Sequence, residues 1–159
     1  MRTHLHKAFV SYRIEFVSFR VERLAGATDP RILDTPQAVA SLARDLIRDD
    51  GREHFGVLLL DPALHLIGYH EVGVGSADQV VSSPRDIFGA ALRVPGCVAI
   101  ISIHNHPSGN VRPSKQDRLL TRHLMKAGTL LNIRLHDHVI VSHANHEHYS
   151  FDDEGALNA

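Results

Sequence analysis

The alternation of apolar and polar side chains predicts a strand near the start of the chain. Residues 8–24 alternate with a period of two, and the phase slips once near Phe16, as it does at a β-bulge. The residues that follow, up to Pro36, are rich in turn formers. We therefore predict a strand arm and linker over residues 1–35, ahead of one folded domain over residues 36–159.

Three later segments carry the start signals of helices. In each, a serine or threonine that can cap the first turn precedes the helical pattern, and in two of them a proline follows at the first helical position. Apolar side chains then recur with helical spacing, which gives each segment one face for a core. The predicted helices run over residues 36–48, from Pro84 to a stop at Pro95, and over residues 114–127.

Five further segments are predicted as strands. Residues 53–60 form a continuous apolar run, which is typical of a strand buried on both faces, and residues 97–103 are similarly apolar. The other predicted strands are 64–74, which pairs back on 53–60 as a hairpin, 131–142 and 148–151. Because helices and strands interleave, we predict an α/β (α+β) fold in which helices pack on a mixed sheet.

Composition narrows the classes of protein to consider. The 159 residues are 43% apolar and 22% charged, and the formal net charge is -1, which argues weakly against a large nucleic-acid footprint. A single cysteine, Cys97, rules out an intramolecular disulfide and a cysteine-rich zinc site within the chain. The first residues do not read as a signal peptide, and no run approaches the roughly 18 apolar residues of a membrane helix. We expect a cytoplasmic location.

The segment from His104 to Asp117 carries the most specific chemistry. His104 and His106 are two residues apart at the end of an apolar strand, so both imidazoles should project on one face. Ser114 is a good helix cap, and Asp117 lies in the first turn of the predicted helix. The carboxylate shares a helical stripe with apolar residues such as Leu120, and it is therefore expected to face inward.

An inward carboxylate next to two imidazoles predicts a metal site. Burial of an unpaired carboxylate is costly, and a zinc ion bound by His104, His106 and Asp117 would remove that cost. Three such ligands leave the fourth tetrahedral position for water, which is typical of catalytic zinc. The alternative is that two histidines lie on a solvated loop while Asp117 only interacts with the helix dipole, because a chance pair is easy to find among 13 histidines.

A hydrolytic zinc site also needs a group that accepts a proton from water. Glu53 is the first candidate, because it stands at the head of a buried strand where a charge can enter a pocket from the end. Glu71, in the return strand of the hairpin, is the alternative. The Ser114 hydroxyl could donate a hydrogen bond to an oxyanion, since a capping oxygen accepts its bond from the backbone and keeps its proton free.

The pattern H104-x-H106-P, S114-x-x-D117 with an upstream glutamate resembles the JAMM (MPN+) signature. The fuller run HNHPSG, followed by Thr121 and by Asp137-His138-Val-Ile-Val, resembles bacterial RadC-like JAMM proteins over roughly residues 36–157. The resemblance implies a catalytic domain with a cytidine-deaminase-like core that hydrolyses peptide or isopeptide bonds. By motif position it implies one zinc ion on His104, His106 and Asp117, with Glu53 as acid/base and Ser114 as oxyanion donor.

Departures from that pattern leave other interpretations open. Longer RadC-like proteins have a helix-hairpin-helix segment ahead of this domain, whereas the 35 residues here read as strand and linker, which weakens any inferred role with DNA. A DNA repair or recombination accessory with little or no peptidase activity is the main alternative. A purely structural zinc site would need a fourth protein ligand, and the sequence offers no obvious one.

Several other histidines have open roles. His138 is either a group that supports a zinc ligand or half of a structural pair with Asp137. The cluster of His143, His146 and His148 could bind a second metal, although a solvated hairpin tip is the favoured explanation. His136 stands where members of the resembled family commonly have an apolar residue, and its role is open.

Overall fold

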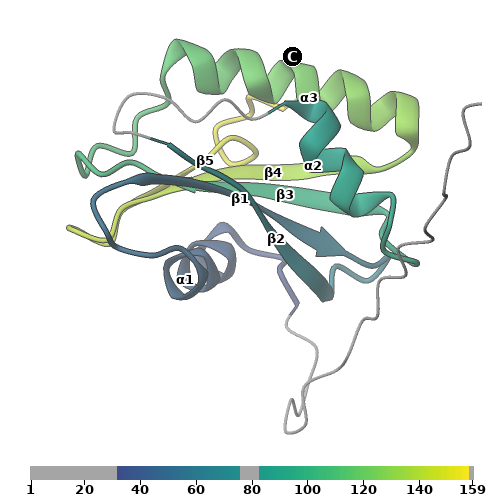
Figure 1. The fold of residues 1–159 in the computed structure, drawn as a ribbon, viewed down its shortest axis with the longest axis horizontal. Coiled ribbons are helices and arrows are strands. Elements are labelled where there is room, and N and C mark those ends of the chain that lie inside the picture. Colours follow the sequence, from purple (N-terminus) through teal and green to yellow (C-terminus); the bar gives the residue numbers. More distant parts are fainter. Residues whose placement is uncertain (1–31, 76–82, 158–159) are drawn as a thin grey trace, which may run out of the picture.

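The computed structural model describes residues 32–75 and 83–157, so the predicted strand at residues 8–24 lies outside the described residues. A mixed five-stranded sheet with the order β2-β1-β3-β4-β5 forms the centre (Figure 1). Only β3 and β4 are parallel, and the other neighbours pair antiparallel. The predicted mixed sheet is confirmed. Its strands are β1 (Glu53–Leu60), β2 (Leu66–Gly75), β3 (Ala99–Asn105), β4 (Arg134–Val141) and β5 (His148–Ser150).

Helices cover both faces of this sheet. Helix α1 (Pro36–Leu46) packs on one face, and α2 (Pro84–Ala91) and α3 (Lys115–Leu131) pack on the other (Figure 1). Thr35 and Ser83 cap the first two helices through their side-chain oxygens, as the sequence predicts. Helix α3 joins the parallel strands β3 and β4, as such a crossover requires. None of the helices in the described ranges is long and apolar enough to cross a membrane.

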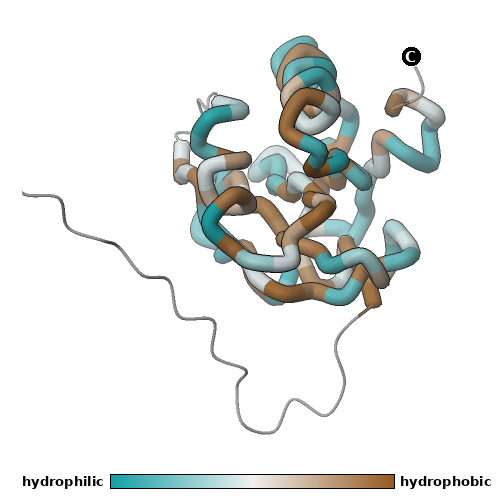
Figure 2. Tube along the Cα trace, turned by 90° about the vertical axis from the view of Figure 1, so that its right-hand side faces the viewer, coloured by the Kyte–Doolittle hydropathy of each residue, from teal (hydrophilic) through white to brown (hydrophobic). Residues whose placement is uncertain are grey.

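Alternate residues of the central strands supply two separate cores. Leu58, Ile101 and Val139 belong to the cluster beneath α1. Their neighbours Val57 and Ile100 belong to the cluster beneath α2 and α3. Strands β1 and β3 accordingly carry long hydrophobic stretches. Hydrophobic and hydrophilic residues alternate along α3, the helix at the top of Figure 2. This two-sided burial explains the continuous apolar runs in the sequence.

Several predicted boundaries were wrong by a few residues. Helix α1 ends at Leu46 rather than at residue 48, and β4 begins at Arg134 rather than at 131. Helix α3 continues past residue 127 to Leu131, because its close packing on the start of β4 accommodates Gly128 inside the helix. A Cβ atom at that glycine would lie 2.5 Å from the carbonyl oxygen of Ile133.

The ends of β3 differ from the prediction in a way that matters for the site. The strand runs from Ala99 to Asn105 rather than from 97 to 103, because pairing with β4 continues to Asn105 opposite Val141. His104 is therefore a buried residue of the strand itself, not of the following loop. Its backbone is held by neighbours on both sides.

Candidate metal centre

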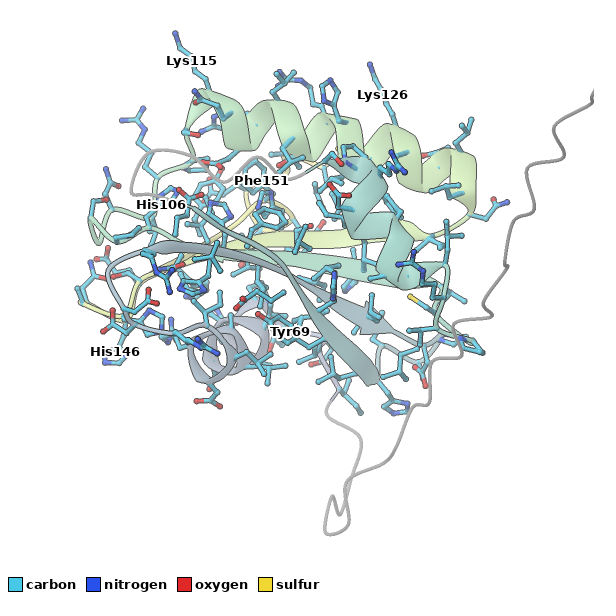
Figure 3. The ribbon with its side chains drawn as sticks, in the orientation of Figure 1. Tyr69, His106, Lys115, Lys126, His146 and Phe151 are labelled. Atoms are coloured by element: carbon cyan, nitrogen blue, oxygen red, sulfur yellow. The ribbon has the colours of Figure 1, made fainter. Side chains whose placement is uncertain are left out.

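The end of β3 and the start of α3 bring His104, His106 and Asp117 together. Their ligand atoms all lie within 4.8 Å of one another, and no other such group of three occurs among residues 32–75 and 83–157. His104 projects from β3 toward α3, His106 follows one residue after the strand, and Asp117 projects from the first turn of α3. Figure 3 places His106 at the end of the sheet where α3 begins.

The spacing of these atoms fits a tetrahedral metal. The Nε2 atoms of His104 and His106 are 3.1 Å apart, and the Asp117 oxygens lie 3.3 Å and 3.6 Å from them. Bonds of about 2.0–2.2 Å at tetrahedral angles put ligand atoms roughly 3.3–3.6 Å apart. The side chain of His104 is fully buried whereas that of His106 is 16% exposed, so the group is open to solvent on one side.

His106 presents a lone pair to the centre of this group. Its Nδ1 lies 2.6 Å from the carbonyl oxygen of Asn110, which can only accept, so Nδ1 carries the proton and Nε2 is left to bind a cation. Burial works to lower the pKa of His106, but the Asp117 carboxylate and the Asn110 carbonyl outweigh it and raise that pKa. A proton on Nε2 therefore competes with a metal for this lone pair.

Asp117 and Ser114 form a reciprocal cap at the start of α3. The Ser114 Oγ accepts from the Asp117 backbone N–H at 3.1 Å, and Asp117 Oδ2 accepts from the Ser114 N–H at 2.7 Å. Burial works to raise the pKa of Asp117, but the two imidazoles and the Ser114 N–H hold it well below its usual range. The carboxylate is thus ionised and fixed in orientation, and the Ser114 hydroxyl proton remains available.

Glu53 lies beside the ligands, at the first position of β1. The register pairs Phe55 with His104, and continuing it by two residues sets Glu53 across from His106. Phe55 also stacks on the His104 ring at 5.5 Å, so this face of β1 points at the ligands. Burial raises the pKa of Glu53, and the nearby imidazoles of His104 and His106 oppose that rise.

The alternative carboxylate, Glu71, is directed elsewhere. Its Oε2 lies 3.3 Å from Nδ1 of His54, whose Nε2 lies 2.9 Å from Asp50. His54 alternates with Glu53 along β1, so its side chain lies on the α1 side of the sheet. The geometry therefore favours Glu53 over Glu71 as the acid/base group.

His138 contacts a predicted ligand directly. Its fully buried ring lies with Nε2 at 2.9 Å from Nδ1 of His104 and with Nδ1 at 2.7 Å from the Thr121 hydroxyl. Asp137 contacts His138 through its backbone N–H and not through its ring, and its other hydrogen bonds come from the Asp152 N–H and the Ser150 hydroxyl. The contact with His104 favours the interpretation in which His138 supports a zinc ligand over the one in which it only pairs with Asp137.

Asn105 is a residue that the sequence reasoning missed. It lies between the two histidines, is 3% exposed, and reaches across to β1. Its Oδ1 accepts from the His54 N–H at 2.7 Å, and its Nδ2 donates to the Arg52 carbonyl at 2.9 Å. The two backbone groups that flank Glu53 are therefore fixed by one side chain. The available signal was a polar amide between two predicted ligands, at the end of a buried strand.

Within residues 32–75 and 83–157, the remaining histidines form no further group of three ligands that could hold a metal. His143 approaches the Arg44 carbonyl at 3.3 Å, and His146 is exposed with φ of +58° at the tip of the turn. His136 accepts a hydrogen bond from Arg134. The turn-tip interpretation of this cluster fits the structure better than a second metal site.

Comparison with protein-family models matches residues 33–156 to the RadC-like JAB domain. The chain belongs to this family. It is 40% identical to a UPF0758 protein of Thermotoga maritima over 128 residues, which are 80% of this chain and 56% of that protein. It is 43% identical to a UPF0758 protein of Trichormus variabilis over 120 residues, 75% of this chain and 49% of that protein. The chain thus spans about half the length of these relatives.

The name UPF0758 assigns no reaction to the relatives. The matched range includes every residue described above for the candidate centre, from Glu53 to His138.

Proposed function

We propose that this RadC-like JAB domain is a zinc-dependent hydrolase that cleaves peptide or isopeptide bonds. The observation that carries the proposal is the convergence of two imidazoles and one carboxylate, open on one side, with a half-buried glutamate next to them. Three protein ligands and an open position are the pattern of catalytic rather than structural zinc. The JAB family relationship supports the choice of an amide substrate.

The residues of the chain fit zinc, since nitrogen and oxygen ligands in this number are what Zn²⁺ takes. Zinc bound by these ligands would supply Lewis-acid chemistry, acidifying a bound water and polarising a carbonyl oxygen. Glu53 would take the proton from the attacking water and return it to the leaving nitrogen. Its raised pKa suits a group that must both accept and release a proton. Ser114 would donate its free hydroxyl proton to the oxygen that becomes negative.

The decisive test compares Glu53→Gln with Glu71→Gln. Both variants remove one carboxylate from β1 or β2, and neither touches a predicted ligand. Each protein would be loaded with zinc, its metal content measured, and its turnover followed on a panel of tagged peptides and isopeptide-linked substrates. We expect Glu53→Gln to retain zinc and lose at least about 100-fold in kcat, since proton transfer by a positioned group contributes about that much. Glu71→Gln should stay within about twofold of the parent.

Two outcomes would contradict the proposal. A zinc-loaded Glu53→Gln protein as active as the parent would remove Glu53 from the mechanism. A parent protein that binds no zinc under conditions where it is folded would remove the metal centre itself.

A second function is favoured by the outer surface of α3. The only carboxylate of this helix, Asp117, faces inward, whereas its exposed or half-exposed side carries four cations at intervals of three or four residues. None of the four forms an ion pair with a described residue, and two of them extend outward in Figure 3. They are Lys115, Arg118, Arg122 and Lys126. We propose this surface as the contact of a nucleic-acid accessory function, with phosphates as its ligands.

Salt-dependent DNA binding separates this function from the first. A labelled duplex would be titrated with the protein at several salt concentrations, and the logarithm of the binding constant plotted against the logarithm of the salt concentration. The magnitude of the slope should fall by about two when Arg118 and Arg122 are both changed to Gln. Arg85→Gln, which changes an exposed cation on α2, is the control and should leave the slope unchanged. A slope near zero for the parent protein would end this candidate and leave the hydrolase proposal untouched.

A further inference from the structure

A chain of three hydrogen bonds leads from the backbone of α3 to the candidate metal ligand His104. The Thr121 Oγ1 lies 2.6 Å from the Asp117 carbonyl oxygen and 2.7 Å from Nδ1 of His138. The His138 Nε2 lies 2.9 Å from Nδ1 of His104. All of these side chains are buried, so no bulk water competes for their protons.

The direction of every bond in the chain follows from its first member. A carbonyl oxygen can only accept, so the single hydroxyl proton of Thr121 points at Asp117. The Thr121 oxygen must then accept from His138, which places a proton on Nδ1 of that ring. The His138 ring is fully buried and contacts no carboxylate among the described residues, so it is neutral, and a neutral ring with Nδ1 protonated has an unprotonated Nε2. His104 must therefore donate from Nδ1.

We infer that Thr121 and His138 are positioning residues that fix the tautomer of His104, leaving its Nε2 lone pair aimed at the metal position. Nothing else among the described contacts of His104 supplies an acceptor for its Nδ1 proton. His106 reaches the same state through the Asn110 carbonyl. Both imidazoles are thus preset for the cation by backbone carbonyls, one directly and the other through two side chains.

The arrangement also ties the third ligand to the first. The carbonyl that begins the chain belongs to Asp117, whose carboxylate faces the same centre. A shift of the first turn of α3 would therefore disturb the carboxylate and the orientation of His104 together. Partners of this kind typically change metal affinity by about 10- to 100-fold when they are removed.

The first experiment reads the tautomers directly in the zinc-free protein. Long-range ¹H–¹⁵N spectra at about pH 8.5 distinguish Nδ1-protonated from Nε2-protonated rings. We expect His138 and His104 both to be Nδ1-protonated. A wild-type His138 protonated at Nε2 would overturn the inference, and this result does not depend on any variant being stable.

The second experiment breaks the chain without changing a ligand. In Thr121→Val, His138 loses the acceptor for its Nδ1 proton, so the Nε2-protonated form becomes favoured and donates to His104. That places the competing proton on the ligand atom of His104. We expect chelator competition to show zinc bound about 10- to 100-fold more weakly. The absorption of the cobalt-substituted protein should change in shape, and Thr121→Ser should restore both readouts.

Thr129→Val is the matched control. Thr129 makes the same type of hydroxyl bond to a carbonyl four residues back on α3, at 2.9 Å from Met125, far from the ligands. It should leave zinc affinity within about twofold of wild type. Equal affinity in Thr121→Val and Thr129→Val would overturn the inference.

The inference rests on the proposed metal centre but not on hydrolysis. If no substrate is cleaved while the tautomers and zinc affinities behave as described, the chemistry proposed for Glu53 fails and the positioning chain stands. If zinc binds equally tightly in every variant and peptides are cleaved, the positioning chain fails and the hydrolase proposal stands.

Discussion

At the residue scale, Asn105 connects the two halves of the candidate site. Its neighbours in sequence supply imidazoles, while its amide binds the backbone on either side of Glu53. At this end of β1 the Asn105 side chain supplies two hydrogen bonds in place of a neighbouring strand's backbone. The distance between Glu53 and the ligands therefore depends on this one side chain.

Asn105→Ala tests that dependence. The Arg52 carbonyl and the buried His54 N–H would lose their partner, which should lower the free energy of unfolding by about 1–3 kcal/mol. Because Glu53 would no longer be held in place, kcat should fall about 10- to 100-fold, with zinc affinity nearly unchanged. Ser150→Ala, which removes a buried clamp on β5, is expected to lower stability similarly without affecting kcat. Equal kcat values for the two variants would make Asn105 merely structural.

The raised pKa of His106 makes a prediction about zinc affinity and pH. In the metal-free protein, Asp117 and the Asn110 carbonyl favour the protonated imidazole, so zinc must displace a proton. Zinc affinity should be highest at pH values well above the raised pKa of His106. It should fall as pH drops through that pKa, by up to about tenfold per pH unit for each proton displaced. Chelator competition between about pH 8.5 and pH 5.5 measures this. A flat profile over that range would contradict it.

At the element scale, the hairpin of β1 and β2 depends on a glycine beneath an aromatic ring. A Cβ atom added to Gly56 would lie 2.5 Å from Cε2 of Tyr69 and 2.9 Å from its hydroxyl. The tyrosine ring thus occupies the space where a side chain on β1 would stand. This close fit is located on the strand that carries Glu53.

Gly56→Ala should therefore destabilise the protein by about 1–3 kcal/mol, as overpacking does. Gly89→Ala is the matched change on α2, where the new Cβ would meet only the Arg93 guanidinium, 4.0 Å away. Because alanine is the better helix former, that variant should be more stable by up to about 1 kcal/mol. Urea unfolding measures both. A Gly56→Ala protein as stable as wild type would show that Tyr69 moves aside freely.

The kinds of element could be predicted from the sequence, but some of their ends could not. Caps at Thr35, Ser83 and Ser114 are local signals, and all three helices start where those residues predict. The far end of α3 is set by contact between Gly128 and the start of β4, and the end of β3 by pairing with β4. Such contacts join residues far apart in the sequence, where local pattern carries no information.

The same distinction applies to the candidate site. His104, His106 and Asp117 lie within 14 positions of one another, so strand and helix periodicity already predicted their convergence. Choosing between Glu53 and Glu71 required the register of β1 against β3. The contact of His138 with His104 spans 34 residues and depends on the parallel pairing of β3 with β4, which no local motif predicts.

At the scale of the whole molecule, Asp137 joins β4 to β5 and to the C-terminal turn. Its Oδ1 accepts from the backbone N–H groups of His138 and Asp152, and its Oδ2 lies 2.7 Å from the Ser150 hydroxyl. Burial raises the pKa of Asp137 to about 6 from an ordinary value of 3.8, although these three donors oppose the rise. The folded protein therefore holds this proton more tightly than the unfolded chain does.

The sign of the resulting pH dependence follows directly. The contribution of protonated Asp137 to the free energy of unfolding is greatest below about pH 4 and is lost as pH rises through about 6. A pKa shift of about two units corresponds to roughly 3 kcal/mol. Asp137→Asn should remove this dependence, because the asparagine oxygen can accept both backbone bonds while its amide donates to Ser150. The difference in unfolding free energy between the two proteins, measured by urea denaturation from about pH 4 to pH 8, should change by that amount in favour of the variant. A difference that stays constant within about 0.5 kcal/mol would mean that Asp137 is ionised throughout, with its three donors outweighing the effect of burial.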